Sequence, residues 1–146
     1  MQSGFGVFLD DFRVCPPPTV LITLSQYVFG IGQTGIVKFS FSRVPIGFDM
    51  GDIEAENGIL SNFRVTSNPL IYEAIFTPMA NIFDETNVIS VGTGWTDRMA
   101  NGPIGPTFSN NYIVNTLIPI THIIRVTTDG IVRGISGGYI RIVTEE

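Results

Sequence analysis

Four oxygen-bearing side chains in two turn-rich stretches are the first candidates for chemistry. Asp49 and Asp52 stand three residues apart, and Asp97 and Asn101 stand four residues apart. Calcium takes six to eight oxygen ligands from carboxylates, amides and carbonyls, so these four residues are a candidate calcium site. Asp and Asn at such positions also cap and shape turns, and the strict spacing of an EF-hand is absent. Turn shaping is therefore the alternative, and no other cofactor is indicated.

The sequence offers little for catalysis. His122 is the single histidine and stands among isoleucines, which is typical of a strand edge; no nucleophile elbow accompanies it. Together with the distant Cys15 it cannot form a zinc site of the usual kind. The acid pairs 10–11, 84–85 and 145–146 are adjacent in sequence, and adjacent side chains on a strand point to opposite faces. We therefore expect a protein that is not an enzyme.

A further group of residues is suited to protein contacts. Trp95, the only tryptophan, stands between glycine and threonine in a loop, and aromatic side chains dominate interface hot spots. It is either an exposed anchor for a partner or a sugar ring, or a plug at one end of the core. The other candidates for contacts are apolar residues toward the two ends of the chain, namely Phe5, Phe8, Ile123 and Ile140.

The elements that position these residues are expected to be β-strands. Ile occurs 20 times and Thr 14 times, and β-branched side chains suit a pleated, half-buried surface. Gly and Pro, at 16 and 9 residues, supply turns between short strands. Charged residues make up 14%, against roughly 25% in an ordinary domain. A partner is expected to cover part of this weakly charged surface; the alternative is an exterior rich in Ser, Thr and Asn.

We expect the chain to divide into an N-terminal arm (1–16), a β-sandwich (17–116) and a C-terminal β-hairpin extension (117–146). Consecutive prolines at 16–18 end the arm, because proline cannot sit in a central strand. Asp129-Gly130 is a strong hairpin signal within the extension. The expected strands are 5–14, 19–25, 35–43, 53–56, 59–66, 70–77, 87–91, 112–115, 122–127, 131–135 and 139–144.

Two of these runs alternate between apolar and polar residues, which indicates strands with one buried face. Val37, Phe39 and Phe41 share one face of the run 35–43, and Tyr72, Ala74 and Phe76 share one face of the run 70–77. We expect the rings on these faces to meet in a dry layer between two sheets. The fold class is therefore all-β.

Charge and hydropathy exclude several classes of partner. The net charge is −5 and the eight cations are scattered singly, whereas nucleic-acid binding needs clustered Lys and Arg. No run approaches the ~20 apolar residues of a membrane span. The apolar run 4–9 has no basic segment before it and ends at Asp10, so it does not fit a signal peptide. If Met1 is the natural start, we expect synthesis in a cytoplasm without export by the usual route.

Residues 17 to about 116 resemble a bacterial immunoglobulin-like domain, of the kind repeated in secreted adhesins and found singly in tailed-phage virion proteins. The segments that carry the resemblance occur in the family's order: VKFSFS at 37–42, GFDMGD at 47–52, NGILSNF at 57–63, YEAIFTP at 72–78, and the loop residues Asp97 and 100–102. The resemblance implies an immunoglobulin-like sandwich. Some adhesin modules of this type bind calcium near such loops, which implies the same chemistry for the four oxygen donors.

The resemblance, with flanking segments on both sides of one module, favours a tailed-phage virion structural or decoration protein in a head, tail or tail tip. Its expected partners are capsid or tail proteins in a homo-oligomer or lattice, and a host-surface glycan or protein. Its expected location is the virion, assembled in the host cytoplasm. The alternative is a repeat module of a bacterial surface adhesin or biofilm protein, located at the cell surface or outside the cell. Exposed strand edges in the arm and extension would join other chains, or would pair with each other.

Overall fold

The computed structural model describes residues 16–119, 123–126 and 132–135. Within these ranges the chain is built from β-strands and one 3-10 turn, η1 (Met50–Asp52), which confirms the all-β prediction. Of the expected strands, 5–14 and 139–144 lie outside the described residues, as do Phe5, Phe8 and Ile140. No helix in the described part of the chain is long and apolar enough to cross a membrane.

Four antiparallel strands form the first layer of the sandwich. Their order across the sheet is β3 (Val20–Leu24), β5 (Gly35–Phe41), β8 (Ile71–Pro78) and β7 (Gly58–Val65). In the centre of this sheet Val37 lies opposite Ala74, and Phe39 lies opposite Tyr72. The alternation seen in the sequence is thereby confirmed, because these cross-strand pairs share the face that the sequence assigns to the core.

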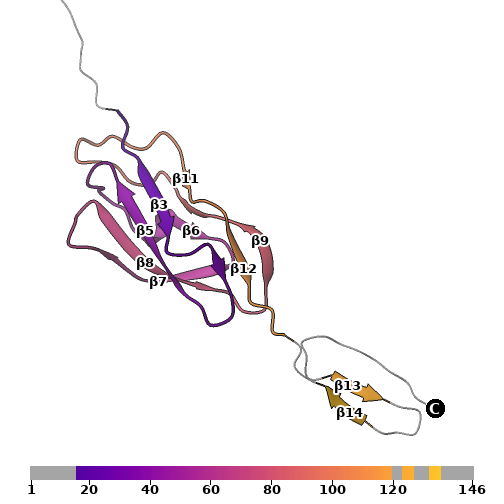
Figure 1. Cartoon of the computed structure of the whole chain (residues 1–146). Coiled ribbons are helices and arrows are strands. Elements are labelled where there is room, and N and C mark those ends of the chain that lie inside the picture. The colour runs from indigo at the N-terminus through magenta and orange to yellow at the C-terminus, as the bar shows by residue number, and fades with distance from the viewer. Residues whose placement is uncertain (1–15, 120–122, 127–131, 136–146) are drawn as a thin grey trace, which may run out of the picture.

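The second layer consists of short strands that pair in two groups. One group has the order β4 (Val28–Phe29), β12 (Tyr112–Asn115), β9 (Phe83–Asn87), and the other has the order β11 (Thr107–Phe108), β10 (Ile89–Val91), β6 (Ile53–Ala55). Only Val88 separates β9 from β10, and the backbone N–H of Ser109 donates to Ile89 across the junction. The two groups therefore continue one another as a single layer (Figure 1).

The pairing pattern is that of an immunoglobulin-like sandwich. In chain order the strands of the first layer are β3, β5, β7 and β8. In the sheet β3 lies beside β5, and β7 lies beside β8, as the corresponding strands do in one sheet of the immunoglobulin fold. In the second layer β4 runs parallel to β12, while the remaining pairs are antiparallel. The short parallel pair lets the beginning of the module close against its last strand.

Aromatic rings fill the space between the layers. Phe41 contacts both Phe48 and Trp95 edge to face, with ring centroids 4.8 and 4.9 Å apart. At the other end Phe76 packs against Phe29 and Tyr112 at 4.9 and 5.1 Å. Such tilted contacts add to the hydrophobic gain of burying the rings. The sequence predicts four aromatic rings in the core. Phe39, Phe41 and Phe76 are buried there, and Tyr72 packs against them and is half-buried.

A buried polar network fastens the turn after β6 to the second layer. Asn57 has a positive φ of 53° and donates through Nδ2 to Asn87 Oδ1 at 2.6 Å. Asn87 is buried, and its own Nδ2 donates to the carbonyls of Asp84 and Tyr112, each at 3.0 Å. The Tyr112 hydroxyl donates to the carbonyl of Glu56 at 2.5 Å. Burial, with the charge of Glu56 as a smaller cause, raises the pKa of Tyr112, so the hydroxyl keeps its proton.

Beyond the sandwich, β13 (Ile123–Val126) and β14 (Val132–Ile135) form an antiparallel two-stranded sheet. This pairing confirms two antiparallel strands on either side of Asp129-Gly130, while the turn itself lies outside the described residues. Arg125 lies at the same register position as Arg133, directly across the pair. Neither strand pairs with a strand of the sandwich within the described ranges. Ile123, a predicted contact residue, is the first residue of β13.

Candidate functional site

The predicted calcium ligands lie in two different turns. Asp49 caps η1: its Oδ1 accepts from the N–H of Gly51 at 2.8 Å, and its own N–H donates to Asp52 Oδ2 at 2.9 Å. This reciprocal pair is a capping box, which satisfies backbone donors at the start of a helical turn. Both carboxylates therefore have hydrogen-bond partners within their own turn.

Asp97 and Asn101 form the second turn. Asp97 is 2% exposed, and its Oδ1 accepts from the backbone N–H groups of Met99 and Asn101 at 2.8 and 2.9 Å. No three His, Cys, Asp or Glu side chains of the described residues come together as metal ligands, so Asp49, Asp52 and Asp97 do not share one site. These hydrogen bonds match the turn-shaping alternative, while calcium binding stays a prediction.

An ion pair between Arg43 and Asp97, which the sequence did not predict, connects the second turn to the start of the module. Arg43 Nη1 lies 2.6 Å from Asp97 Oδ2, and Arg43 Nη2 donates to the carbonyl of Pro16. The two charged residues are 54 positions apart in sequence, and no local pattern links them. The chain entering the sandwich, the end of β5 and the loop after Trp95 are thereby held together.

Acid is expected to weaken the fold through Asp97. Burial raises its pKa, but hydrogen bonds from Asn101, Met99 and Arg43 outweigh burial and hold the pKa below its ordinary value of 3.8. A carboxyl with a lowered folded-state pKa stabilises the protein above its unfolded pKa, about 3.9, and loses that contribution as pH falls through the folded value. We expect the melting temperature of Asp97→Asn to fall less between about pH 5 and pH 2 than that of the wild type.

The melting temperature of Asp97→Asn should still fall somewhat with pH, because a second carboxyl group titrates in the same direction. Hydrogen bonding from the backbone N–H of Thr86, opposed by burial, lowers the pKa of Asp84. Asp84 thus titrates in the same direction and keeps part of the acid sensitivity in Asp97→Asn. If the melting temperatures of the variant and of the wild type fall by the same amount across this pH range, the role given to Asp97 is wrong.

Trp95 is not the exposed anchor that one prediction made of it. Its side chain is 1% exposed, and its Nε1–H donates to the carbonyl of Gly92 at 3.0 Å. The indole packs edge to face on Phe41, so it closes one end of the core, as the alternative had it. A loop residue can be buried because the loop folds back over the open end of the sandwich.

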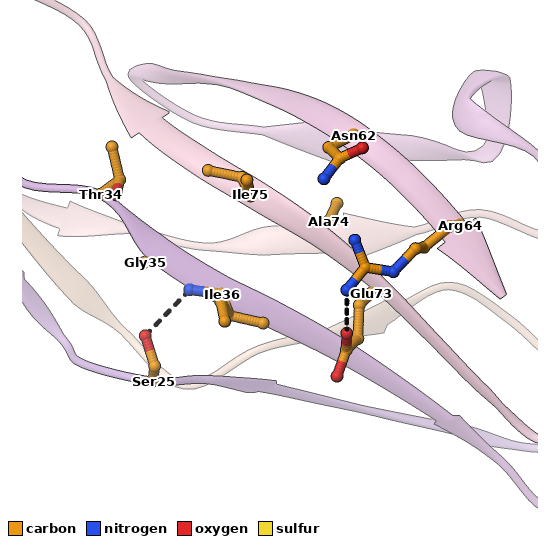
Figure 2. A pocket seen from close by; sticks show the side chains of 9 residues that line it. All are labelled: Ser25, Thr34, Gly35, Ile36, Asn62, Arg64, Glu73, Ala74 and Ile75. Carbon is orange, nitrogen blue, oxygen red and sulfur yellow. Dashed lines mark hydrogen bonds and ion pairs between the residues drawn. The ribbon is translucent and has the colours of Figure 1, made fainter. Parts of the chain in front are cut away.

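The outward face of the first sheet is a candidate contact surface because it is hollowed. Its hollow of 390 Å³ lies across β5, β8 and β7, between aliphatic and charged side chains (Figure 2). Arg64 pairs with Glu73 across the strands at 3.2 Å, and Ile36 is 49% exposed. The residues around the hollow are Ser25, Thr34, Gly35, Ile36, Asn62, Arg64, Glu73, Ala74 and Ile75.

A bulge in β7 borders this hollow. The register of β7 against β8 shifts between Ser61 and Arg64, and Asn62 within the shift has a φ of 54°. A bulge inserts an extra residue into one strand and bends it away from its partner. Sequence reasoning missed this site, although the Asn62 of NGILSNF, a residue type that tolerates positive φ, was a weak signal for it.

Comparison with known proteins finds a match that covers the sandwich. A family model described as "Bacterial Ig-like domain" matches residues 15–114, which is more than half of the chain. No curated protein and no solved structure matches the chain. The matched residues include every strand from β3 to β11 and most of β12. The chain therefore belongs to the bacterial Ig-like domain family.

Proposed function

We propose that the protein is a non-enzymatic structural or decoration component of a tailed-phage virion, and that it works through contacts with other virion proteins. Family membership supports the broader part of this proposal, a module for protein–protein or surface contacts. The observation that carries the narrower part is the two-stranded sheet of β13 and β14 that follows the sandwich.

A two-stranded sheet is poorly stable on its own. An isolated hairpin is marginal in water. Among the described residues no third strand pairs with β13 or β14, and an open strand edge can offer its N–H and C=O groups to another chain. A strand edge supplied by a neighbouring protein would offset this marginal stability, as happens when a strand is added to a sheet in an assembly.

The same hairpin separates this proposal from the second candidate, a repeat module of a bacterial surface adhesin. Family membership favours an adhesin equally. In a tandem array, however, the residues after one module would begin another. The first paired strands of this module, β3 and β5, are separated by residues 25–34, whereas only residues 127–131 separate β13 from β14. The segment after the sandwich therefore does not repeat the module's opening.

Deletion of the flanking segments tests the proposal. A variant lacking residues 1–16 and 117–146 is expected to keep the sandwich and to be lost from particles assembled in its presence. Two single deletions would show which segment joins the particle, and circular dichroism of the variant would show whether the sandwich remains folded. If the folded double-deletion variant enters particles as well as the full chain does, attachment by these segments is wrong.

A further inference from the structure

The two sheets of the sandwich differ in charge. The strands β3, β5, β8 and β7 carry two cations, Lys38 and Arg64, and one anion, Glu73. The strands of the second layer carry three anions, Glu54, Asp84 and Glu85, and no cation. One face of the module is therefore complementary in charge to the other, which is the arrangement that steers one surface onto a second.

On the first sheet, Lys38 has no salt-bridge partner among the described residues. It stands two residues after Ile36, a residue that lines the hollow, and both side chains are exposed. Lys38 lies opposite Glu73 in register, but within the described ranges Glu73 forms its ion pair with Arg64. Alternate residues of a strand share a face and lie about 6.6–6.8 Å apart, so β5 presents an apolar and a positive group at that spacing.

On the second layer, β9 carries an exposed phenyl ring and, two residues later, an exposed carboxylate, next to a register shift between Asp84 and Asn87. Phe83 is 51% exposed, and Glu85 is exposed two residues later. Asp84 between them is already engaged, because its carboxylate accepts hydrogen bonds from Thr86 and Asn57. Glu85 has no salt-bridge partner among the residues that the structure describes. An exposed phenyl ring two residues before an exposed carboxylate is suited to a hollow that Ile36 and Ile75 line, with Lys38 two residues further along β5.

We propose that β9 of a second copy of this chain docks on the outward face of β5 and β8. Phe83 of the second copy enters the hollow beside Ile36, and its Glu85 pairs with Lys38. Because the two surfaces lie on opposite layers of the sandwich, the contact is heterologous, and repeated contacts link copies in a row or ring. This inference deepens the proposed function and rests on it for its biological meaning, since it names one partner within the assembly.

Charge reversal in the purified full-length chain tests the contact. Sedimentation equilibrium at rising protein concentration should show reversible self-association that weakens with salt. Lys38→Glu and Glu85→Lys should each weaken it at least about tenfold, because each places like charges together. The double variant Lys38→Glu/Glu85→Lys should regain association, and so should an equimolar mixture of the two single variants.

Two matched variants separate this contact from a change in net charge. Arg98→Glu reverses an exposed cation in a loop, and Glu54→Lys reverses another exposed acid of the second layer; both should associate like the wild type. A wild type that stays monomeric up to millimolar concentration would overturn the inference. So would equal weakening by the control variants, or a double variant that fails to recover. A chain that enters particles but stays monomeric would overturn only this inference, and a self-associating chain that is absent from particles would overturn only the virion proposal.

Discussion

Replacing Trp95 with Ala is expected to destabilise the protein by about 3–5 kcal/mol, the usual range for removing a large buried aromatic side chain. The indole is 1% exposed and packs on Phe41, so its removal leaves a cavity at the end of the core. Since domains are stable by only about 5–15 kcal/mol, this loss is a large fraction of the total. Thermal unfolding followed by circular dichroism should show a melting temperature roughly 10–20 °C lower.

Trp95→Phe is the matched variant for this prediction. It retains an aromatic ring but loses the Nε1–H that donates to the carbonyl of Gly92. We expect a smaller loss, about 1–3 kcal/mol, because the partly buried carbonyl of Gly92 is left without its donor. The wild-type tryptophan fluorescence, which comes from this single residue, should shift to longer wavelength on unfolding. An Ala variant as stable as the wild type would contradict the burial of Trp95.

The second large effect is expected from Gly58→Ala. Gly58 begins β7, and a Cβ at this position would lie 2.0 Å from Cε1 and 2.2 Å from Cζ of the buried Phe76 ring. Phe76 cannot simply move aside, because it packs against Phe29 and Tyr112. Overpacking of this kind costs about 1–3 kcal/mol and occasionally more, which urea unfolding would measure as a lower midpoint.

Gly105→Ala serves as the control for the same chemical change. A Cβ at Gly105 would meet nothing within 4 Å, and the substitution also reduces the freedom of the unfolded chain. We expect its unfolding midpoint to equal or slightly exceed that of the wild type. If Gly58→Ala and Gly105→Ala unfold at the same urea concentration, the contact between Gly58 and the Phe76 ring is wrong.

Strands with one buried face were predictable from sequence because their signal is local. In β5 the apolar residues Val37, Phe39 and Phe41 alternate with polar neighbours, and the period of two alone fixes which side is buried. The strands β4 and β11 were missed because each has only two residues, which is too short for a two-residue period to be recognised. In β9, the sequence FDETN has a single apolar residue, and that residue is exposed rather than buried.

The site was less predictable because it depends on residues far apart in sequence. Arg43 and Asp97 meet only after the two layers pack, and charge pairing across 54 residues leaves no trace in local spacing. The acidic residues were recognised as important, but the sequence cannot distinguish a carboxylate that binds metal from one that accepts backbone N–H groups. The hollow on the first sheet is likewise bordered by a register shift, which can be recognised only when β7 is aligned with β8.

Imaging the native particle at residue resolution tests most directly whether this Ig-like module is a virion part. We expect density for the sandwich at regular positions on a head, tail or tail tip, with β13 and β14 continuing into a sheet of a neighbouring protein. Particles that contain no such density, from cells in which the chain is instead found at the bacterial surface, would contradict the proposal and leave the adhesin module in its place.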